Sequence, residues 1–286
     1  MVRYLQSIRI SNLLLLSLLF WGLMLNYLPT IHLFLKDHLL LFFSILTTTS
    51  SGYLINNFFD KESDHVNDKE QLVQFSSKFY LSNYFIHLII SFILLLVSNL
   101  SGNWFFLVLC CHLMTLLYSW KLQHFPLIGN LTVAILCCLV VITPIFLAKK
   151  MPFIESLNIE NELCGIFILF CFLLTICREI IKDIEDIKGD QKVNSNTLPI
   201  ITNLVISKSI ALIIALGALF LLAIVCINSN ISIQSLLLLV FSGIPLTIFI
   251  LKTYPLKEPQ FFKGPSNWIK ITFLSASLWL YVNLLL

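Results

Sequence analysis

The sequence has few charged residues and no segment typical of a soluble domain. Only 12% of its 286 residues are Asp, Glu, Lys or Arg, whereas 58% are hydrophobic. The mean hydropathy is +0.92, outside the usual range of soluble globular chains. The chain also lacks low-complexity tracts and obvious short repeats. These features exclude a soluble globular protein and indicate an integral membrane protein.

The cysteines lack the spacing of metal and redox motifs. None of the eight forms a CxxC pair, and no histidine stands at metal-finger spacing from them. All eight fall inside long apolar runs, where a thiol packs as a small hydrophobic group. We therefore predict no disulfide bond.

Nine apolar runs are long enough to cross a bilayer, which takes about 20 residues of helix. The first run follows Arg3 and Arg9, as in a signal peptide, but it is long and lacks a small-residue cleavage site, so we interpret it as a span. The runs cover residues 10–28, 39–58, 79–97, 104–120, 127–148, 163–182, 204–227, 231–251 and 268–286.

The basic residues indicate which ends of these spans face the cytoplasm. With the N-terminus inside, all of the eighteen Lys and Arg residues except Lys36, Lys149 and Lys150 fall on inside segments. Cytoplasmic segments carry such an excess of Lys and Arg. We expect a multi-pass protein of the cell inner membrane, with the N-terminus and the acid-rich loops in the cytoplasm.

The first acid-rich loop, NNFFDKESDHVND at residues 56–68, follows the second span. Asn56, Asp60, Asp64 and Asn67 are separated by steps of four, four and three. If the helix continues into the loop, they share an arc of roughly 80°. Oxygen-bearing side chains on one face suit a hard cation such as Mg²⁺, which binds one or two carboxylates together with water and phosphate oxygens.

The second acid-rich loop, REIIKDIEDIKGD at residues 178–190, ends the sixth span on the same inside face. Four of its acidic side chains lie within an arc of about 60° if the helix persists to Gly189. Like charges stacked in this way repel one another and weaken the helix. A divalent cation bound between them would turn this repulsion into a net attraction. The four are Glu179, Asp183, Asp186 and Asp190.

Acidic loops between membrane helices are often only solvated connectors. Two such loops on one face, each with acids on one side of a helix end and with basic residues nearby, favour a shared metal and phosphate site instead. His65 and His124 lie beside the loops. Either could shuttle protons, but the simpler interpretation is an ordinary histidine at the membrane interface.

These segments resemble the UbiA-type intramembrane prenyltransferases. NNFFDKESD matches the family's NxxxDxxxD motif, and DIKGD matches its later DxxxD motif. LYSWKLQHFPLIGNLTVA is similar to the family segment after the fourth span, and it supplies Tyr118 and Lys121. The similarity covers nearly the whole chain, and nine spans is the family's number.

The resemblance implies an all-α membrane protein, a bundle of nine transmembrane helices around a central cavity, with residues 1–286 as a single transmembrane prenyltransferase domain. It implies Mg²⁺ as cofactor, with a polyprenyl diphosphate and a lipophilic acceptor as partners among membrane lipids. We expect no nucleic-acid partner and no obligate protein partner.

The resemblance also assigns site residues. It implies catalytic roles for Asp60, Asp64, Asp186 and Asp190. It implies metal binding by Asn56, Asp60, Asp64, Asp183, Asp186 and Asp190. It implies diphosphate binding by Asn56, Tyr118, Lys121, Arg178 and Lys182.

Three positions depart from the family pattern. Asn57 replaces the aspartate of the common ND opening, Gln71 stands at an arginine position, and Gln123 stands where a lysine often follows Lys121. These changes reduce the phosphate-binding charge, but the metal-binding acids are intact. We therefore expect an active enzyme.

The second motif most resembles the branch that alkylates geranylgeranylglyceryl phosphate, the digeranylgeranylglyceryl phosphate synthases. The alternative acceptor is aromatic: a quinone precursor, homogentisate or a chlorophyll-type ring. A cation-dependent transporter is disfavoured, because transporter sites usually lie near the bilayer midplane. An alcohol phosphotransferase acting on CDP-linked lipids is disfavoured because its DGxxAR signature is absent.

Overall fold

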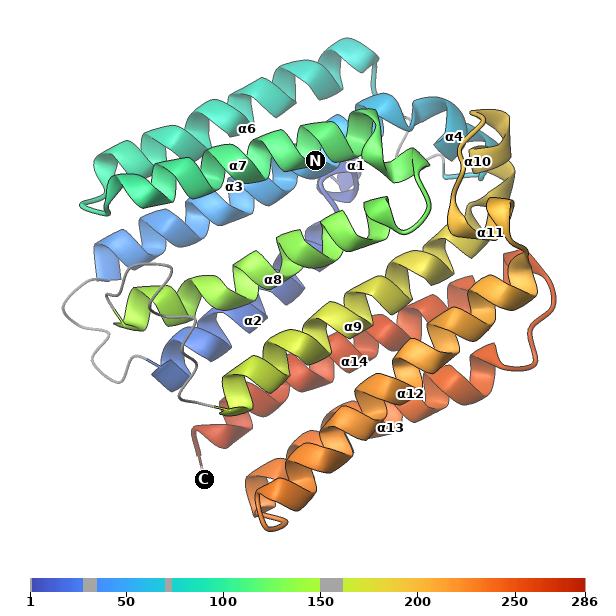
Figure 1. Ribbon diagram of the computed structural model, residues 1–286. Coiled ribbons are helices and arrows are strands. Elements are labelled where there is room, and N and C mark those ends of the chain that lie inside the picture. The colour runs from blue at the N-terminus through green and yellow to red at the C-terminus, as the bar shows by residue number, and fades with distance from the viewer. Residues whose placement is uncertain (1, 28–34, 70–73, 150–161, 286) are drawn as a thin grey trace. The chain divides into compact units, whose positions relative to one another are not determined.

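The computed structural model describes residues 2–27, 35–69, 74–149 and 162–285, and in these residues the chain forms helices and no strands. The all-α prediction is confirmed. A long helix overlaps each of the nine expected spans within this described part. They are α2 (Ile10–Tyr27), α3 (Leu35–Phe59), α6 (Ser77–Val97), α7 (Gly102–Trp120), α8 (Ile128–Lys149), α9 (Glu162–Glu185), α12 (Leu204–Asn228), α13 (Ile233–Thr253) and α14 (Lys263–Asn283) (Figure 1).

Within the described residues, six short helices connect or precede the long ones. They are α1 (Val2–Ser7), α4 (Lys61–Val66), η2 (Leu122–His124), α10 (Ile187–Lys192), α11 (Leu198–Ile201) and η4 (Pro259–Phe261). The departure predicted at Gln71 lies outside the described residues.

Five of the described helices are long and apolar enough to cross a membrane, by length and composition. They run over Lys36–Phe59, Ser77–Val97, Gly102–Trp120, Leu204–Asn228 and Ile233–Thr253. Ile10–Asn26 and Ile128–Pro144 are apolar but shorter. These helices fit a multi-pass membrane protein, whereas a crossing by all nine remains a prediction.

Several helix starts follow from local side-chain chemistry. Ser76 accepts a hydrogen bond from the backbone N–H of Phe79 at the start of α6. Asn203 accepts one from Ile206 over 2.8 Å at the start of α12. Such caps satisfy backbone donors that have no partner within the helix. The polar residues between the apolar runs therefore set where these helices begin.

The chain forms two compact units. Unit 1 comprises Met1–Ser17, Thr30–Phe125 and Lys188–Ser195, and unit 2 comprises Leu18–Pro29, Pro126–Ile187 and Asn196–Leu286. The second acid-rich segment is therefore divided, because its residues up to Ile187 belong to unit 2 and those from Lys188 onward belong to unit 1.

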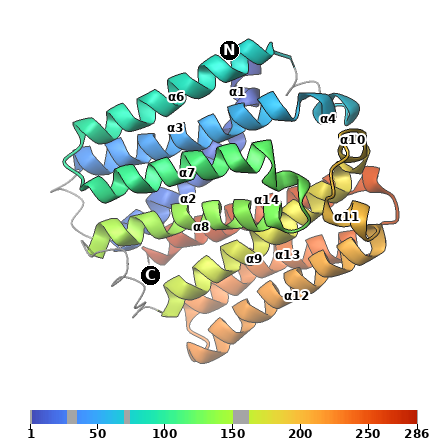
Figure 2. The ribbon, with the colours of Figure 1, turned by 45° about the horizontal axis from the view of Figure 1, so that its top comes forward.

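In unit 1, helix α3 packs against α6 and α7, and the three lie side by side in both ribbon views (Figures 1 and 2). A buried polar cluster joins them around His112 of α7. The ring nitrogens of His112 lie 2.9 Å from Ser91 Oγ of α6 and 3.2 Å from Ser51 Oγ of α3. Polar contacts of this kind connect helices where no water is present to compete.

In unit 2, helix α9 packs against α8, α12 and α14, and α13 packs against α12 and α14. The inner face of α9 is apolar, with Phe170, Leu174, Ile180 and Ile184 almost completely buried. This burial holds α9 in place from Phe170 to Ile184. Its last two turns, which carry Arg178 to Glu185, are consequently held on a rigid element.

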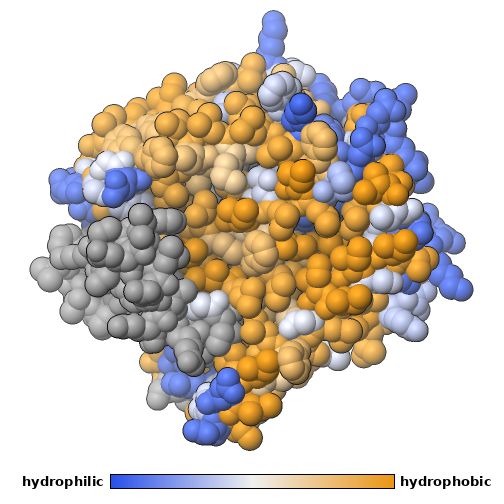
Figure 3. Space-filling model, in the orientation of Figure 1, coloured by the Kyte–Doolittle hydropathy of each residue, from blue (hydrophilic) through white to orange (hydrophobic). Residues whose placement is uncertain are grey.

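The surface over the long helices is mainly hydrophobic, and hydrophilic residues gather at helix ends (Figure 3). On α6, for example, Phe85, Ile89 and Leu96 are exposed. Apolar side chains exposed over whole helices are unfavourable in water but are solvated by lipid tails. The surface therefore supports the membrane location.

Candidate functional site

The first acidic motif lies where a long helix breaks into a short one. Helix α3 ends at Phe59, and α4 begins at Lys61 with Asp60 between them. The helical hydrogen bonds nevertheless continue through the break, from Asp60 N to Asn56 O and from Asp64 N to Asp60 O, both 2.8 Å. The predicted continuation of the helix is confirmed, so the three motif side chains share one face.

Asp60 is held from two sides within unit 1. Gln123 Nε2 donates to Asp60 Oδ1 over 2.6 Å, and the Asn56 amide donates to Asp60 Oδ2. Burial and the nearby charge of Asp64 raise the pKa of Asp60 to about 7, whereas the hydrogen bond from Gln123 lowers it. Without a cation, Asp60 is therefore about half protonated at pH 7 and mostly protonated below it.

Asp64 is buried in the first turns of α4 and forms an ion pair with Lys69. Lys69 Nζ lies 3.4 Å from Asp64 Oδ1, and the Lys69 backbone N–H donates to Asp64 O. These two contacts hold the loop that follows α4 against Asp64. The charge of Lys69 also lowers the pKa of Asp60.

Arg9 and Tyr53 form a contact beside the first motif that the sequence analysis did not predict. The Arg9 guanidinium lies 4.9 Å from the centre of the Tyr53 ring, one turn before Asn56, and Arg9 also lowers the pKa of Asp60. Arg9 has a left-handed backbone, with φ of 52°, at the break between α1 and α2. Nothing in the sequence marks this break, so Arg9 could be read only as an inside-facing charge.

Asn57, the departure beside the motif, is fully buried. Its side-chain amide donates to Ser7 O of α1 over 2.8 Å. The side chain therefore ties the N-terminal helix to α3. An aspartate would present no N–H to that carbonyl, which gives the substitution a structural consequence in this chain.

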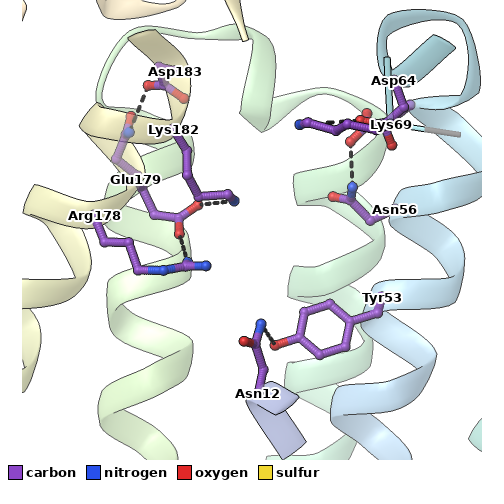
Figure 4. A network of polar contacts seen from close by, with 11 residues as sticks. Asn12, Tyr53, Asn56, Asp64, Lys69, Arg178, Glu179, Lys182 and Asp183 are labelled. Carbon is purple, nitrogen blue, oxygen red and sulfur yellow. Dashed lines mark hydrogen bonds and ion pairs between the residues drawn. The ribbon is translucent and has the colours of Figure 1, made fainter. Parts of the chain in front are cut away.

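The second acidic motif begins on the last turns of α9, in unit 2. Glu179 is buried and accepts from Arg178 Nη1 over 2.6 Å and from Lys182 Nζ over 3.0 Å (Figure 4). Asp183 Oδ2 accepts from Asn130 Nδ2 of α8 over 2.8 Å. The two predicted diphosphate-binding cations thus converge on one carboxylate, a contact that the helical wheel did not reveal.

Asp186 stands between α9 and α10 as Asp60 stands between α3 and α4. Helix α9 ends at Glu185 and α10 begins at Ile187, and Asp186 N donates to Lys182 O over 2.9 Å. In each motif one aspartate occupies the junction, and a second, Asp64 or Asp190, lies four residues later in a six-residue helix. The two motifs therefore share one local architecture.

Tyr118 and Lys121 lie at the end of α7, in unit 1. Tyr118 is partly buried, and Lys121 is exposed and follows the last helical residue, Trp120. The residue from this segment that contacts the first motif is Gln123. Diphosphate binding by Tyr118 and Lys121 remains a prediction.

The donor set fits a hard divalent cation. Asn56, Asp60 and Asp64 supply only oxygen ligands on one helical face, as Mg²⁺ prefers. Among the described residues, no group of three or more His, Cys, Asp or Glu side chains is already gathered as a metal site. The Asn56 amide donates to Asp60 in this state. To bind a cation, this amide would rotate and present its oxygen.

An all-helical membrane protein with two such motifs has the architecture of a prenyltransferase family. The chain belongs to the UbiA prenyltransferase family, whose sequence model matches residues 15–275. It is 33% identical to the digeranylgeranylglyceryl phosphate synthase of Pyrococcus horikoshii over 163 residues, 57% of this chain and 55% of that protein. It is 37% identical to the protein of the same name from Methanosphaera stadtmanae over 163 residues, 55% of this chain and 54% of that one.

These alignments span about half the length of the curated relatives that the chain matches. The predicted resemblance to the digeranylgeranylglyceryl phosphate synthase branch is confirmed by them. A solved structure, a UbiA homolog from Archaeoglobus fulgidus bound to DMAPP and Mg²⁺, aligns with a TM-score of 0.66 and 16% identity, covering 96% of this chain and 99% of that one. This likeness shows that the fold is the same.

Proposed function

We propose that this protein transfers a polyprenyl group from a prenyl diphosphate to a lipophilic acceptor in a Mg²⁺-dependent reaction. The proposed acceptor is a glycerol lipid of the geranylgeranylglyceryl phosphate kind. The observation that carries the proposal is the pair of acidic motifs with one local architecture, each with an aspartate at a helix break and another four residues later.

Family membership and the relatives' names support this reaction. The relatives from Pyrococcus horikoshii and Methanosphaera stadtmanae are named digeranylgeranylglyceryl phosphate synthases. The Archaeoglobus fulgidus homolog was solved with a prenyl diphosphate, DMAPP, and with Mg²⁺. The oxygen-rich motifs of this chain suit the same cation.

The residues proposed to hold Mg²⁺ are Asn56, Asp60 and Asp64 in the first motif and Asp183, Asp186 and Asp190 in the second. When bound, Mg²⁺ neutralises the diphosphate oxygens and so favours their departure. Cationic and polar side chains would hold the remaining oxygens of the diphosphate. These are Arg178, Lys182, Tyr118 and Lys121.

The proposed reaction breaks the allylic C1–O bond of the diphosphate and forms a bond from C1 to the acceptor. For a glycerol lipid the acceptor is a hydroxyl, and its proton is lost as the ether forms. The products are the ether lipid, pyrophosphate and a proton. Apolar walls would solvate the isoprenoid and keep water from the allylic cation, which explains why this chemistry takes place within a bilayer.

The proposal places the whole chain, as one transmembrane prenyltransferase domain, across the membrane nine times. The motifs and the N-terminus lie on the cytoplasmic side, where most basic residues fall. The membrane would be the cell inner membrane.

The test is product identification with purified protein in lipid nanodiscs. The protein is incubated with Mg²⁺, one of several prenyl diphosphates, and either geranylgeranylglyceryl phosphate or an aromatic acceptor, and products are identified by mass. We expect an ether lipid with the glycerol phosphate acceptor. A prenylated aromatic ring would reassign the acceptor, and the absence of product and of pyrophosphate with every pair would refute catalysis.

A further inference from the structure

The end of the second acidic motif packs onto the end of the first. Residues Lys188–Ser195 cluster with unit 1, although they continue the chain from α9 of unit 2. The backbone N–H of Gly189 donates to Asn67 Oδ1 over 2.9 Å. Asn67 is the C-cap residue of α4 and lies three residues after Asp64, the last residue of the first motif. The contact therefore joins two motifs that are more than a hundred residues apart in sequence.

The contact leaves no room for a side chain at position 189. Gly189 is buried, and a Cβ added there would lie 2.5 Å from both the backbone oxygen and the hydroxyl oxygen of Ser63. Real Cβ atoms essentially never come this close. The glycine is required here for space, because close backbone approach is possible only without a Cβ.

A second contact holds the far end of the same segment. His124 Nδ1 lies 2.6 Å from Ser195 Oγ, and Ser195 N donates to Asp190 O over 2.9 Å. Asp190 thus lies between two points of attachment. One is Gly189 on Asn67, and the other is Ser195 on His124.

The groups that form the contact between Asn67 and Gly189 are neutral, which matters because the segments they join are acidic. Ser63 directly precedes Asp64, and Gly189 directly precedes Asp190, so the contact draws two carboxylate-bearing segments together. Like charges oppose this approach. An amide, a backbone N–H and a close-packed glycine hold the segments without adding charge that would compete for a cation.

We propose that Asn67 is a positioning residue that fixes Asp190 relative to Asp60 and Asp64 before any ligand binds, with Gly189 as its partner and His124 as a second attachment. This inference rests on the proposed function, because it concerns the metal and diphosphate site. It assigns Asn67 a role outside the proposed metal ligands.

The contact itself is tested by amide hydrogen exchange on the full-length protein in nanodiscs, without substrate. In Asn67→Ala, peptides covering residues 187–195 are expected to exchange faster, and Asn67→Asp, which keeps an acceptor oxygen, is expected to restore protection. Gly189→Ala is expected to act like Asn67→Ala. The matched control is Gly217→Ala in α12, where an added Cβ meets no heavy atom within 4 Å.

The consequence for the site is tested with Mg²⁺ and inorganic pyrophosphate, which require no turnover. We expect the Mg²⁺ concentration for half-maximal thermal stabilisation to rise about tenfold in Asn67→Ala and Gly189→Ala, as for other residues that orient metal ligands, and to stay unchanged in Gly217→Ala. Unchanged exchange in both variants, or faster exchange with an unchanged Mg²⁺ requirement, would overturn the inference. A wild type stabilised by Mg²⁺ and pyrophosphate that forms no prenylated product would refute the proposed function and leave the inference standing.

Discussion

Gln123 donates its side-chain amide to Oδ1 of Asp60 over 2.6 Å. In the family pattern a lysine often stands at this position, so this chain places a neutral donor where a cation is common. Gln123 therefore contacts Asp60 without placing a positive charge beside it that would compete with a divalent cation.

The first prediction concerns this donor. In Gln123→Lys the ammonium group would pair with Asp60 and oppose a cation, so we expect the Mg²⁺ concentration for half-maximal stabilisation by pyrophosphate to rise about tenfold. Thermal unfolding across a Mg²⁺ titration measures this. Gln234→Lys, at an exposed position of α13, is the control. An unchanged Mg²⁺ requirement would mean that Asp60 is not a ligand.

The second prediction follows from the pKa of Asp60, which is raised from 3.8 to about 7. Between these values the folded, metal-free protein retains a proton that the unfolded chain releases. Its stability therefore falls as the pH rises from about 4 to 7 and levels off above that range. Because asparagine does not titrate, Asp60→Asn removes this loss of stability. We expect it to melt at a higher temperature than the wild type in EDTA at pH 8, with a smaller difference at pH 5.

The control for that comparison is Asp68→Asn, which removes an exposed carboxylate on the same loop. It is expected to show little pH-dependent gain. A lower melting temperature for Asp60→Asn than for the wild type at pH 8 would show that the Asp60 carboxylate stabilises the metal-free fold, against the expectation.

The third prediction concerns Glu179, which holds Arg178 and Lys182 on α9. In Glu179→Gln the net charge of this group of three rises by one. If the two cations face a diphosphate, inorganic pyrophosphate should bind more tightly to Glu179→Gln without Mg²⁺, and less tightly to Arg178→Ala. Calorimetric titration in EDTA measures both. Equal affinity in all three proteins would remove these cations from the diphosphate site.

The fourth prediction separates structure from catalysis at His112. Its ring forms hydrogen bonds with Ser91 of α6 and Ser51 of α3, so these contacts join three helices of unit 1. We expect His112→Ala to lower the free energy of unfolding by about 2 kcal/mol, from lost hydrogen bonds and the cavity left behind, and Ser91→Ala by about 0.6 kcal/mol. Unfolding in SDS measures the change. Loss of prenyl transfer in folded His112→Ala would assign this residue a catalytic role instead.

Much of the fold follows from the apolar runs, because run length and charge breaks set where long helices form. The four-residue spacing of Asn56, Asp60 and Asp64 likewise predicts their common helical face, and the structure confirms it. These features depend on residues close in sequence. Local periodicity is therefore sufficient to find them.

The contacts that join distant segments could not be predicted in this way. Asn67 meets Gly189, and Gln123 meets Asp60, through tertiary packing that no spacing encodes. The left-handed backbone of Arg9 is similar, because it occurs at a residue type that usually avoids that region. Division of the second motif between units 1 and 2 also depends on packing.

The most direct test of the central claim measures prenyl transfer with and without the cation and the junction aspartates. Wild type, Asp60→Asn and Asp186→Asn are incubated with geranylgeranyl diphosphate and geranylgeranylglyceryl phosphate over a Mg²⁺ titration, and ether lipid and pyrophosphate are quantified. We predict equal amounts of both products from the wild type, none in EDTA, and at least about a hundredfold slower turnover in each variant. Undiminished transfer in EDTA, or in either variant, would contradict the claim that these carboxylates hold the cation that drives ionisation.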